Sequence, residues 1–338
     1  MTNLCHPGTV YVRPDARDWR CEPAPADVRA FHRDLPGYAP TPLTGVPALA
    51  AELGLGRVLV KDESRRLGLP AFKVLGASWA IHRAVPAGSR AHLVTATDGN
   101  HGRAVARMAR LLGHTAEILI PGGVPEEAVA AIEGEGATVR RVDGSYDEAV
   151  RQAAGVEGAV VVQDTAWPGY ERIPGWIVEG YSTLFSEIDD EVPDPDLVVV
   201  PAGVGSLTQA AVTHYRGRPG RTALMTVEPE SAACVLASLL AGQPVTVETG
   251  FTVMTGLNCG TVSSLAWPYL RDGLDAAVAV GEDDSLRAVR DLGALGISAG
   301  PCGAAALAGL RAARRRLDLG PEATVVLLNT EGFVGGGD

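Results

Sequence analysis

The sequence has little of what metal centres, disulfide frameworks and membrane spans require. Its five cysteines are an odd number without CxxC spacing, and its seven histidines form no HExxH pattern. Neither a disulfide framework nor a metal site is therefore indicated. No apolar run approaches the roughly 18 residues of a membrane-spanning helix, and residues 1–20 lack the apolar core of a signal peptide. We therefore expect a cytoplasmic protein with no membrane partner.

Positive charge is also scarce. The sequence has 29 lysines and arginines against 40 aspartates and glutamates, which gives a formal net charge of -11 at pH 7. Nucleic acids select for clustered lysine and arginine, so we expect no nucleic-acid partner. The 338 residues are 46% hydrophobic and 20% charged, which is typical of globular proteins with a sizeable core.

Apolar, β-branched runs alternate with helical patterns, which is typical of βαβ units and mostly parallel sheets. Eight or more strands are many for one sheet, so we expect an α/β fold with two open parallel sheets covered by helices. A smaller α/β domain at residues 85–170 would be inserted in a larger domain formed by residues 1–84 and 171–338. Residues 1–40 show little periodicity and resemble an arm. The expected strands include 92–96, 116–120, 138–142, 159–163, 197–200, 223–227, 276–280 and 324–328, and the expected helices include 101–112, 125–135, 146–154, 176–188, 207–215, 285–295 and 303–316.

One lysine, Lys73, occupies a position suited to reaction. It lies between Phe72 and a helix start rich in small residues, 74–78. An ordinary solvated lysine at a loop-to-helix junction would look the same, since most lysines are solvated. The rest of the chain decides between these interpretations.

Three loops at the carboxyl ends of expected strands carry candidate ligands, because open α/β sheets bind ligands there. The first contains Asp98 and Asn100, which could cap a helix or bind a ligand oxygen. The second, Gly203-Val204-Gly205-Ser206-Leu207, is a plausible phosphate cradle, although a plain strand-to-helix turn would also fit. The third contains Asn329 and Thr330. Together with Lys73, these loops suggest an aldehyde cofactor that is linked to a lysine and carries a phosphate.

The sequence also resembles a known family at several motifs. It resembles the pyridoxal-phosphate enzymes of fold type II, the group of tryptophan synthase β chain and threonine dehydratase, and within that group the diaminopropionate ammonia-lyases. The QDTAW segment discriminates best, because the wider group shares the lysine and the glycine loop but not this segment. The matching segments are KDES at 61–64, GLPAFKVLG at 68–76, DGNHGR at 98–103, QDTAW at 163–167, GVGS at 203–206 and TEG at 330–332.

The resemblance implies how a cofactor, pyridoxal 5'-phosphate, would be held. Lys73 would bind its aldehyde covalently, and Asn100 would hydrogen-bond its ring oxygen. The backbone amides of Gly203 to Leu207 would bind its phosphate. A neutral side chain, either Asn329 or Thr330, would face the pyridine nitrogen, and the sequence leaves that choice open.

The resemblance also implies an activity and two candidate bases. Asp98 and Asp164 would remove the α proton on opposite faces, one for each substrate enantiomer, with Lys73 as the alternative base. From its position alone, Asp164 could equally be a cap at a strand end. The expected reaction is elimination of ammonia from 2,3-diaminopropionate, a small amino-acid substrate, to give pyruvate and ammonia. The family resemblance further implies a homodimer.

Two other functions stay open at this point. One is a sibling enzyme, a serine or threonine dehydratase or a β-replacement synthase that acts on another β-substituted amino acid. The other is a non-catalytic α/β protein whose Gly203 loop binds a phosphate ligand.

Overall fold

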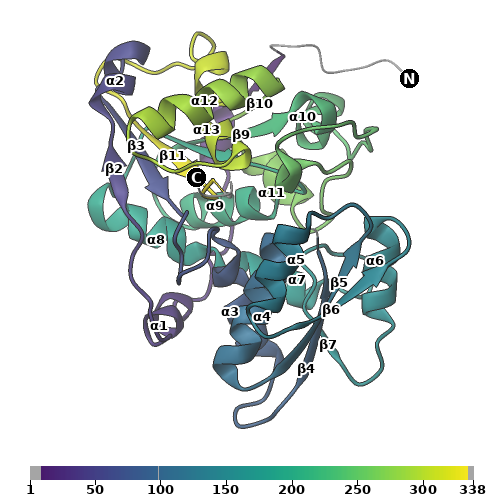
Figure 1. Cartoon of the computed structure of the whole chain (residues 1–338). Helices are drawn as coiled ribbons and strands as arrows, with labels where there is room; N and C mark the ends of the chain where they lie inside the picture. Colours follow the sequence, from purple (N-terminus) through teal and green to yellow (C-terminus); the bar gives the residue numbers. More distant parts are fainter. Residues whose placement is uncertain (1–8, 98, 334–338) are drawn as a thin grey trace.

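The larger of two β-sheets has a parallel centre and antiparallel edges. The computed structural model describes residues 9–97 and 99–333 and has helices on the faces of both sheets (Figure 1). The strand order is β1-β10-β9-β8-β11-β3-β2, in which only the outermost strands, β1 and β2, run antiparallel to their neighbours. The strands are β1 (Val10–Val12), β2 (Leu43–Gly45), β3 (Arg57–Asp62), β8 (Leu197–Pro201), β9 (Ala223–Pro229), β10 (Ala276–Val280) and β11 (Thr324–Asn329).

The smaller sheet is parallel throughout and has the strand order β6-β5-β4-β7. Its strands are β4 (His92–Ala96), β5 (Thr115–Pro121), β6 (Thr138–Val142) and β7 (Val160–Val161). The expected α/β fold with two open sheets is therefore confirmed. The antiparallel edge strands of the larger sheet are an addition that the sequence did not predict.

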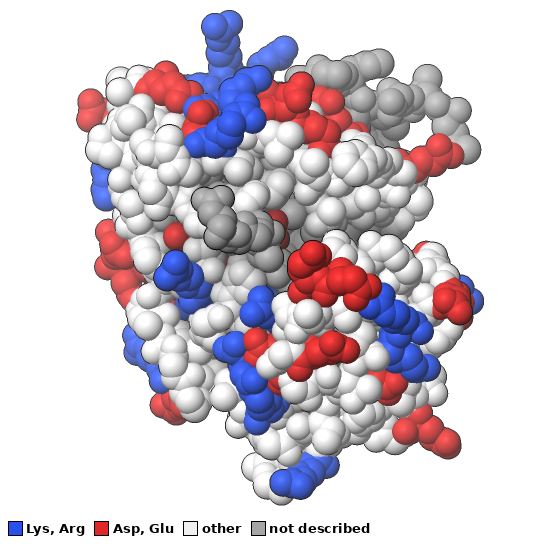
Figure 2. Space-filling view, in the orientation of Figure 1, with Lys and Arg blue, Asp and Glu red and all other residues white. Residues whose placement is uncertain are grey.

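Helices cover both sheets. None in the described ranges is long and apolar enough to cross a membrane. On the face shown in Figure 2, basic side chains lie among acidic ones over both sheets. The helices are α1 (Val28–Arg33), α2 (Pro47–Leu53), α3 (Lys73–Ala84), α4 (Asn100–Leu112), α5 (Glu126–Glu133), α6 (Tyr146–Ala154), α7 (Arg172–Gly180), α8 (Ser182–Glu191), α9 (Ser206–Arg216), α10 (Cys234–Ala241), α11 (Trp267–Gly273), α12 (Glu282–Ala294) and α13 (Pro301–Ala313), with 3-10 turns η1 (Pro14–Asp18), η2 (Glu230–Ala232) and η3 (Thr255–Leu257).

The central strands of the larger sheet, β8, β9, β10 and β11, are buried on both faces. Alternate side chains such as Val199 and Leu327 pack with the alanine-rich α13 on one face. Their neighbours, such as Val198 and Val326, belong to a second core cluster with α3, α7 and α9 on the other face. Side chains alternate along a strand, so strands that are apolar at nearly every position require this double cover.

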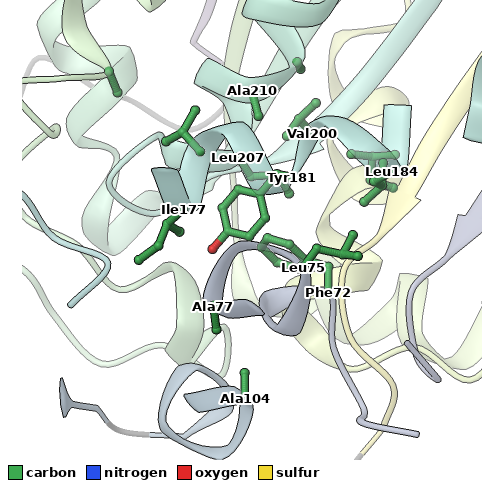
Figure 3. Packing of buried hydrophobic residues seen from close by; sticks show 14 of the residues in the cluster. Phe72, Leu75, Ala77, Ala104, Ile177, Tyr181, Leu184, Val200, Leu207 and Ala210 are labelled. Carbon is green, nitrogen blue, oxygen red and sulfur yellow. The ribbon is translucent and has the colours of Figure 1, made fainter. Parts of the chain in front are cut away.

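The helix that begins at Lys73, α3, is packed closely against α7. Figure 3 shows Leu75 among Tyr181, Ile177 and the neighbouring apolar side chains. A Cβ atom at Gly76 would lie 2.6 Å from Tyr181 Cε1, and one at Gly180 would lie 2.5 Å from the Leu75 carbonyl oxygen. The two backbones approach so closely that only glycine fits, and this contact fixes the start of α3 in a rigid core.

The segment expected to be an arm contains regular structure where it is described. The short strand β1 adds to the edge of the larger sheet beside β10. In α1, the buried His32 lies 2.7 Å from Thr183 Oγ1 and 2.9 Å from the Leu75 carbonyl oxygen. Three residues of strand and six of helix are too short to produce a visible sequence period.

Two expected elements are interrupted. The helix expected at 176–188 is divided between α7 and α8, which meet at Tyr181, next to the close approach of Gly180 to α3. The strand expected at 159–163 is reduced to the two residues of β7. Here the Gln163 N–H donates to the Tyr170 hydroxyl at 2.8 Å instead of continuing a strand ladder.

Candidate active site

Lys73 is one of only two lysines in the sequence and the one that can reach a small molecule. The other, Lys61, is 1% exposed and its Nζ lies 2.6 Å from Glu187 Oε2. Lys73 is the first residue of α3, and its side chain is 27% exposed. Its Nζ donates to Asp164 Oδ2 at 2.9 Å. The structure thus brings together two of the predicted site residues, Lys73 and Asp164.

The ion pair sets the protonation of both partners. Burial lowers the pKa of the Lys73 ammonium, but the Asp164 carboxylate, together with Tyr181 and Tyr146, raises it, and the net shift is upward. Burial raises the pKa of Asp164, but His101 and Lys73 lower it by more. At this contact the structure therefore shows an ionised carboxylate held by a cation. Loss of the charge on Lys73 would make Asp164 a stronger proton acceptor.

His101, on α4, lies beside Asp164. Its ring is buried, and its Nδ1 is 3.8 Å from Asp164 Oδ2. Its Nε2 is 2.7 Å from the Val162 carbonyl oxygen, which can only accept, so Nε2 carries a proton in this contact. Sequence analysis assigned no role to His101, although this residue directly follows Asn100 in the DGNHGR motif.

Gln163 positions the segment that carries Asp164. Its side-chain oxygen accepts from Thr95 Oγ1 and from the Ala96 N–H, both at 2.9 Å. Its Nε2 donates to the Tyr146 hydroxyl at 2.8 Å and lies 3.3 Å from Asp164 Oδ1. Gln163 is fully buried, so the amide ties the residues after β7 to the end of β4. A strand-end cap is therefore the role of Gln163 more than of Asp164.

Asp98 and Asn100 belong to the DGNHGR segment that follows β4 in the sequence. Asp98 lies outside the described residues. The helix begins at Asn100, and the residue before it, Gly99, supplies no side-chain cap. The Asn100 side chain instead donates from Nδ2 to Glu331 Oε2 at 2.9 Å. Asn100 therefore points toward the end of β11 and not back onto its own helix.

The loop of Gly203 to Leu207 joins β8 to α9 and requires glycine at two positions. A Cβ atom at Gly203 would lie 2.9 Å from Cys259 Sγ, and Gly205 has a left-handed φ of +97°. The first N–H groups of an α-helix have no partner within the helix and lie at the positive end of its dipole. α9 has 11 residues and begins at Ser206, so a phosphate fits this loop.

Asn329 is the last residue of β11, and Thr330, which is 5% exposed, directly follows it. Asn329 is 1% exposed, and its Nδ2 donates to Asp62 Oδ1 at 2.8 Å and to the Ser298 carbonyl oxygen at 2.9 Å. Both of its N–H groups are therefore used within the protein. A Cβ atom at Gly303 would lie 2.0 Å from Asn329 Oδ1, which shows how closely α13 covers this amide.

A buried ionic cluster anchors the segment before Lys73. Arg66 is fully buried and donates to Glu63 Oε1 at 2.7 Å and to Glu187 Oε1 at 2.7 Å. Burial raises the pKa of Glu187, but Arg66 and Lys61 lower it by more, and the net result is a pKa of about 2. Sequence analysis assigned Arg66 no role. Its burial could not be inferred because Glu187 lies 121 positions away.

Comparisons with known proteins agree with this geometry. Residues 35–331 match the model of the family described as "Pyridoxal-phosphate dependent enzyme". The chain is 36% identical to a diaminopropionate ammonia-lyase of Escherichia coli K12 in a match that covers 90% of this chain and 87% of that protein. It is 37% identical to the diaminopropionate ammonia-lyase of Salmonella typhimurium over 297 residues, which cover 78% of this chain and 73% of that protein.

A solved structure is also similar. It is the E. coli diaminopropionate ammonia-lyase in complex with an aminoacrylate-PLP azomethine reaction intermediate. The TM-score is 0.87 at 33% identity, and the match covers 96% of this chain and 94% of that one. The resemblance found in the sequence is confirmed. This chain belongs to the family of pyridoxal-phosphate-dependent enzymes.

Proposed function

We propose that this protein is an ammonia-lyase that eliminates ammonia from 2,3-diaminopropionate to give pyruvate and ammonia. The observation that carries the proposal is the position of Asp164. It follows β7 in the QDTAW segment and lies 2.9 Å from Lys73 Nζ. A carboxylate beside a reactive lysine can accept the α proton of an amino acid that is bound next to that lysine. The similarity to diaminopropionate ammonia-lyases over 90% of the chain supports the same activity.

The cofactor would be held by residues from both sheets. Lys73 would bind the aldehyde of pyridoxal 5'-phosphate, because the other lysine, Lys61, is buried in an ion pair. The N–H groups of Gly203, Val204, Gly205, Ser206 and Leu207 would bind the phosphate. Asn100 would donate to the ring oxygen.

Thr330 would face the pyridine nitrogen. Both N–H groups of Asn329 are engaged with Asp62 and Ser298, which leaves the neighbouring hydroxyl as the neutral donor. This proposal chooses between the two residues that the sequence left open.

Three residues of the chain would then be the proton acceptors. When bound, the cofactor supplies an electron sink that acidifies the α carbon of an amino acid. Asp164 would accept the α proton on one face, and Asp98 would serve the other face. Lys73, as a free amine, is the alternative proton acceptor. Either carboxylate could also pair with the departing β-ammonium. After that group leaves, water converts the remaining enamine to pyruvate and a second ammonia.

A substrate panel tests the proposed activity. Purified, cofactor-loaded protein should release pyruvate faster from D- or L-2,3-diaminopropionate than from serine, and should form little 2-oxobutyrate from threonine. Faster turnover of serine than of either diaminopropionate enantiomer would instead make the protein a dehydratase. Turnover of none of these substrates by protein that holds the cofactor would reject elimination on this substrate class.

Three broader features are proposed alongside the activity. Residues 85–170 would form the smaller domain, because β4 to β7 lie between residues 92 and 161. The remaining residues, 1–84 and 171–338, would form the larger cofactor-binding domain.

A homodimer, supported by the family resemblance, should elute as twice the monomer mass of 35.1 kDa in size-exclusion chromatography with light scattering. We propose a cytoplasmic location as well.

A further inference from the structure

The carboxylate of Glu331 accepts hydrogen bonds from the first turns of two helices, α4 beside the smaller sheet and α13 beside the larger one. Its Oε2 accepts from Asn100 Nδ2 at 2.9 Å, at the start of α4. Its Oε1 accepts from the Cys302 N–H at 3.4 Å, at the start of α13. Glu331 lies two residues beyond the end of β11. None of the roles proposed so far uses this carboxylate.

The backbone around Glu331 holds its side chain in place. Its carbonyl oxygen accepts from the Gly300 N–H at 3.0 Å, and it forms an isolated bridge with Ala71, two residues before Lys73. A Cβ atom at Gly300 would lie 2.8 Å from Glu331 Oε1. The carboxylate therefore fits against the backbone that leads into α13, and it is fixed relative to Lys73.

This contact determines which end of the Asn100 amide faces the carboxylate. A carboxylate only accepts hydrogen bonds, so it must face the amide nitrogen and not the amide oxygen. One hydrogen of Nδ2 is then used by Glu331, and the second is left for another acceptor. A hydrogen bond to a charged group is also stronger than one between neutral groups.

We propose that Glu331 is a positioning residue that orients Asn100 for the cofactor. By holding one hydrogen of Nδ2, it makes Asn100 a donor to the ring oxygen of pyridoxal phosphate and prevents the amide from turning its own oxygen toward it. The inference rests on the proposed placement of the cofactor's ring oxygen at Asn100.

Glu331→Gln tests the inference with little change in shape. Glutamine keeps an acceptor for the Cys302 N–H, but its NH₂ can donate to Asn100 Oδ1 and lets the Asn100 amide turn over. The dissociation constant for pyridoxal phosphate should rise roughly tenfold or more, and the visible absorption maximum of the bound cofactor should shift. Thermal unfolding of the cofactor-free protein should stay unchanged. Glu157→Gln, at an exposed glutamate of the smaller domain, should alter none of these readouts.

A double-mutant cycle with Asn100→Ala separates positioning from a structural role. Glu331→Gln should have no further effect on affinity or absorption in the Asn100→Ala background, because the two residues act through one contact. An equal effect in both backgrounds would overturn the inference. So would a loss of affinity that only follows a loss of thermal stability. If Glu331→Gln does not fold, Glu331→Asp, which keeps the charge but shortens the reach to Asn100, should give the same shift in absorption.

These readouts use no substrate, so they are separate from the test of the activity. Protein that shows the expected shifts but does not turn over diaminopropionate would support the role of Glu331 and reject the proposed substrate. An Asn100→Ala variant with unchanged cofactor affinity and absorption would overturn the inference itself.

Discussion

Replacing Asp164 by asparagine removes the negative charge 2.9 Å from Lys73 Nζ while keeping the size of the side chain. A hydrogen bond to a charged group contributes about 1.5 to 3 kcal/mol, and one pKa unit corresponds to about 1.4 kcal/mol. The pKa of Lys73 should therefore fall in Asp164→Asn, and the fraction of Lys73 that is a neutral amine near neutral pH should rise roughly ten- to hundredfold. Because only the neutral amine attacks an aldehyde, the variant should capture the cofactor at lower pH than the parent protein.

Two assays measure the consequences of Asp164→Asn. The rate at which cofactor-free protein takes up pyridoxal phosphate at a fixed pH of about 8, followed by visible absorbance, should rise roughly ten- to hundredfold. Pyruvate formation from one diaminopropionate enantiomer should fall by a factor of about 10² to 10⁴, the usual contribution of a general base. The other enantiomer should be spared. Asp143→Asn, at an exposed aspartate of the smaller sheet, should change neither rate.

Two results would refute this reasoning. An unchanged rate of cofactor uptake at that pH would mean that the Lys73–Asp164 ion pair does not control the pKa of Lys73. Equal losses on both enantiomers would mean that Asp164 does not serve one face only, and the division of labour with Asp98 would be wrong.

Three further changes test other parts of the site and core. Gly203→Ala places a methyl group 2.9 Å from Cys259 Sγ and should weaken cofactor binding about tenfold. Gly293→Ala, in α12, should leave cofactor binding intact, because a Cβ atom there would meet no atom within 4 Å beyond its own helix. Equal losses of cofactor affinity in the two variants would refute the assignment of the Gly203 loop to the phosphate. Thr330→Val should weaken cofactor binding about fivefold and Thr330→Ser should restore it; unaltered binding in both would reject this residue. Burial lowers the pKa of His32 from 6.5 to about 4, so its contribution to the free energy of unfolding is complete above pH 6.5 and is lost as the pH falls toward 4. Denaturant titrations should show a loss of up to about 3 kcal/mol over that window. His32→Gln should remove this dependence of the free energy of unfolding on pH, and an unchanged dependence in the variant would contradict the role of His32.

Local patterns in the sequence were sufficient for much of the fold. The small residues after Lys73 predicted the start of α3, and the apolar run before Gly203 predicted β8, because strand, glycine turn and helix signals are adjacent there. The pattern of apolar residues does not predict where tertiary contacts interrupt a helix or strand. The break at Tyr181 and the short β7 both lie at such contacts.

The candidate site could be predicted only as a set of loops. The pairing of Lys73 with Asp164 spans 91 positions, and that of Asn100 with Glu331 spans 231. No local pattern encodes such separations. The proposed choice of Thr330 over Asn329 rests on the burial and the partners of the Asn329 amide, which follow from the packing of α13 over the end of β11.

Covalent trapping of the cofactor tests the central claim most directly. The cofactor-loaded protein is reduced with borohydride and digested, and the modified peptide is located by mass spectrometry. The sequence has two lysines, so the measurement has two possible positive results. We expect the adduct on Lys73 and none in Lys73→Ala. An adduct on Lys61, or no adduct in protein that contains the cofactor, would contradict the assignment of Lys73 and the site built around it.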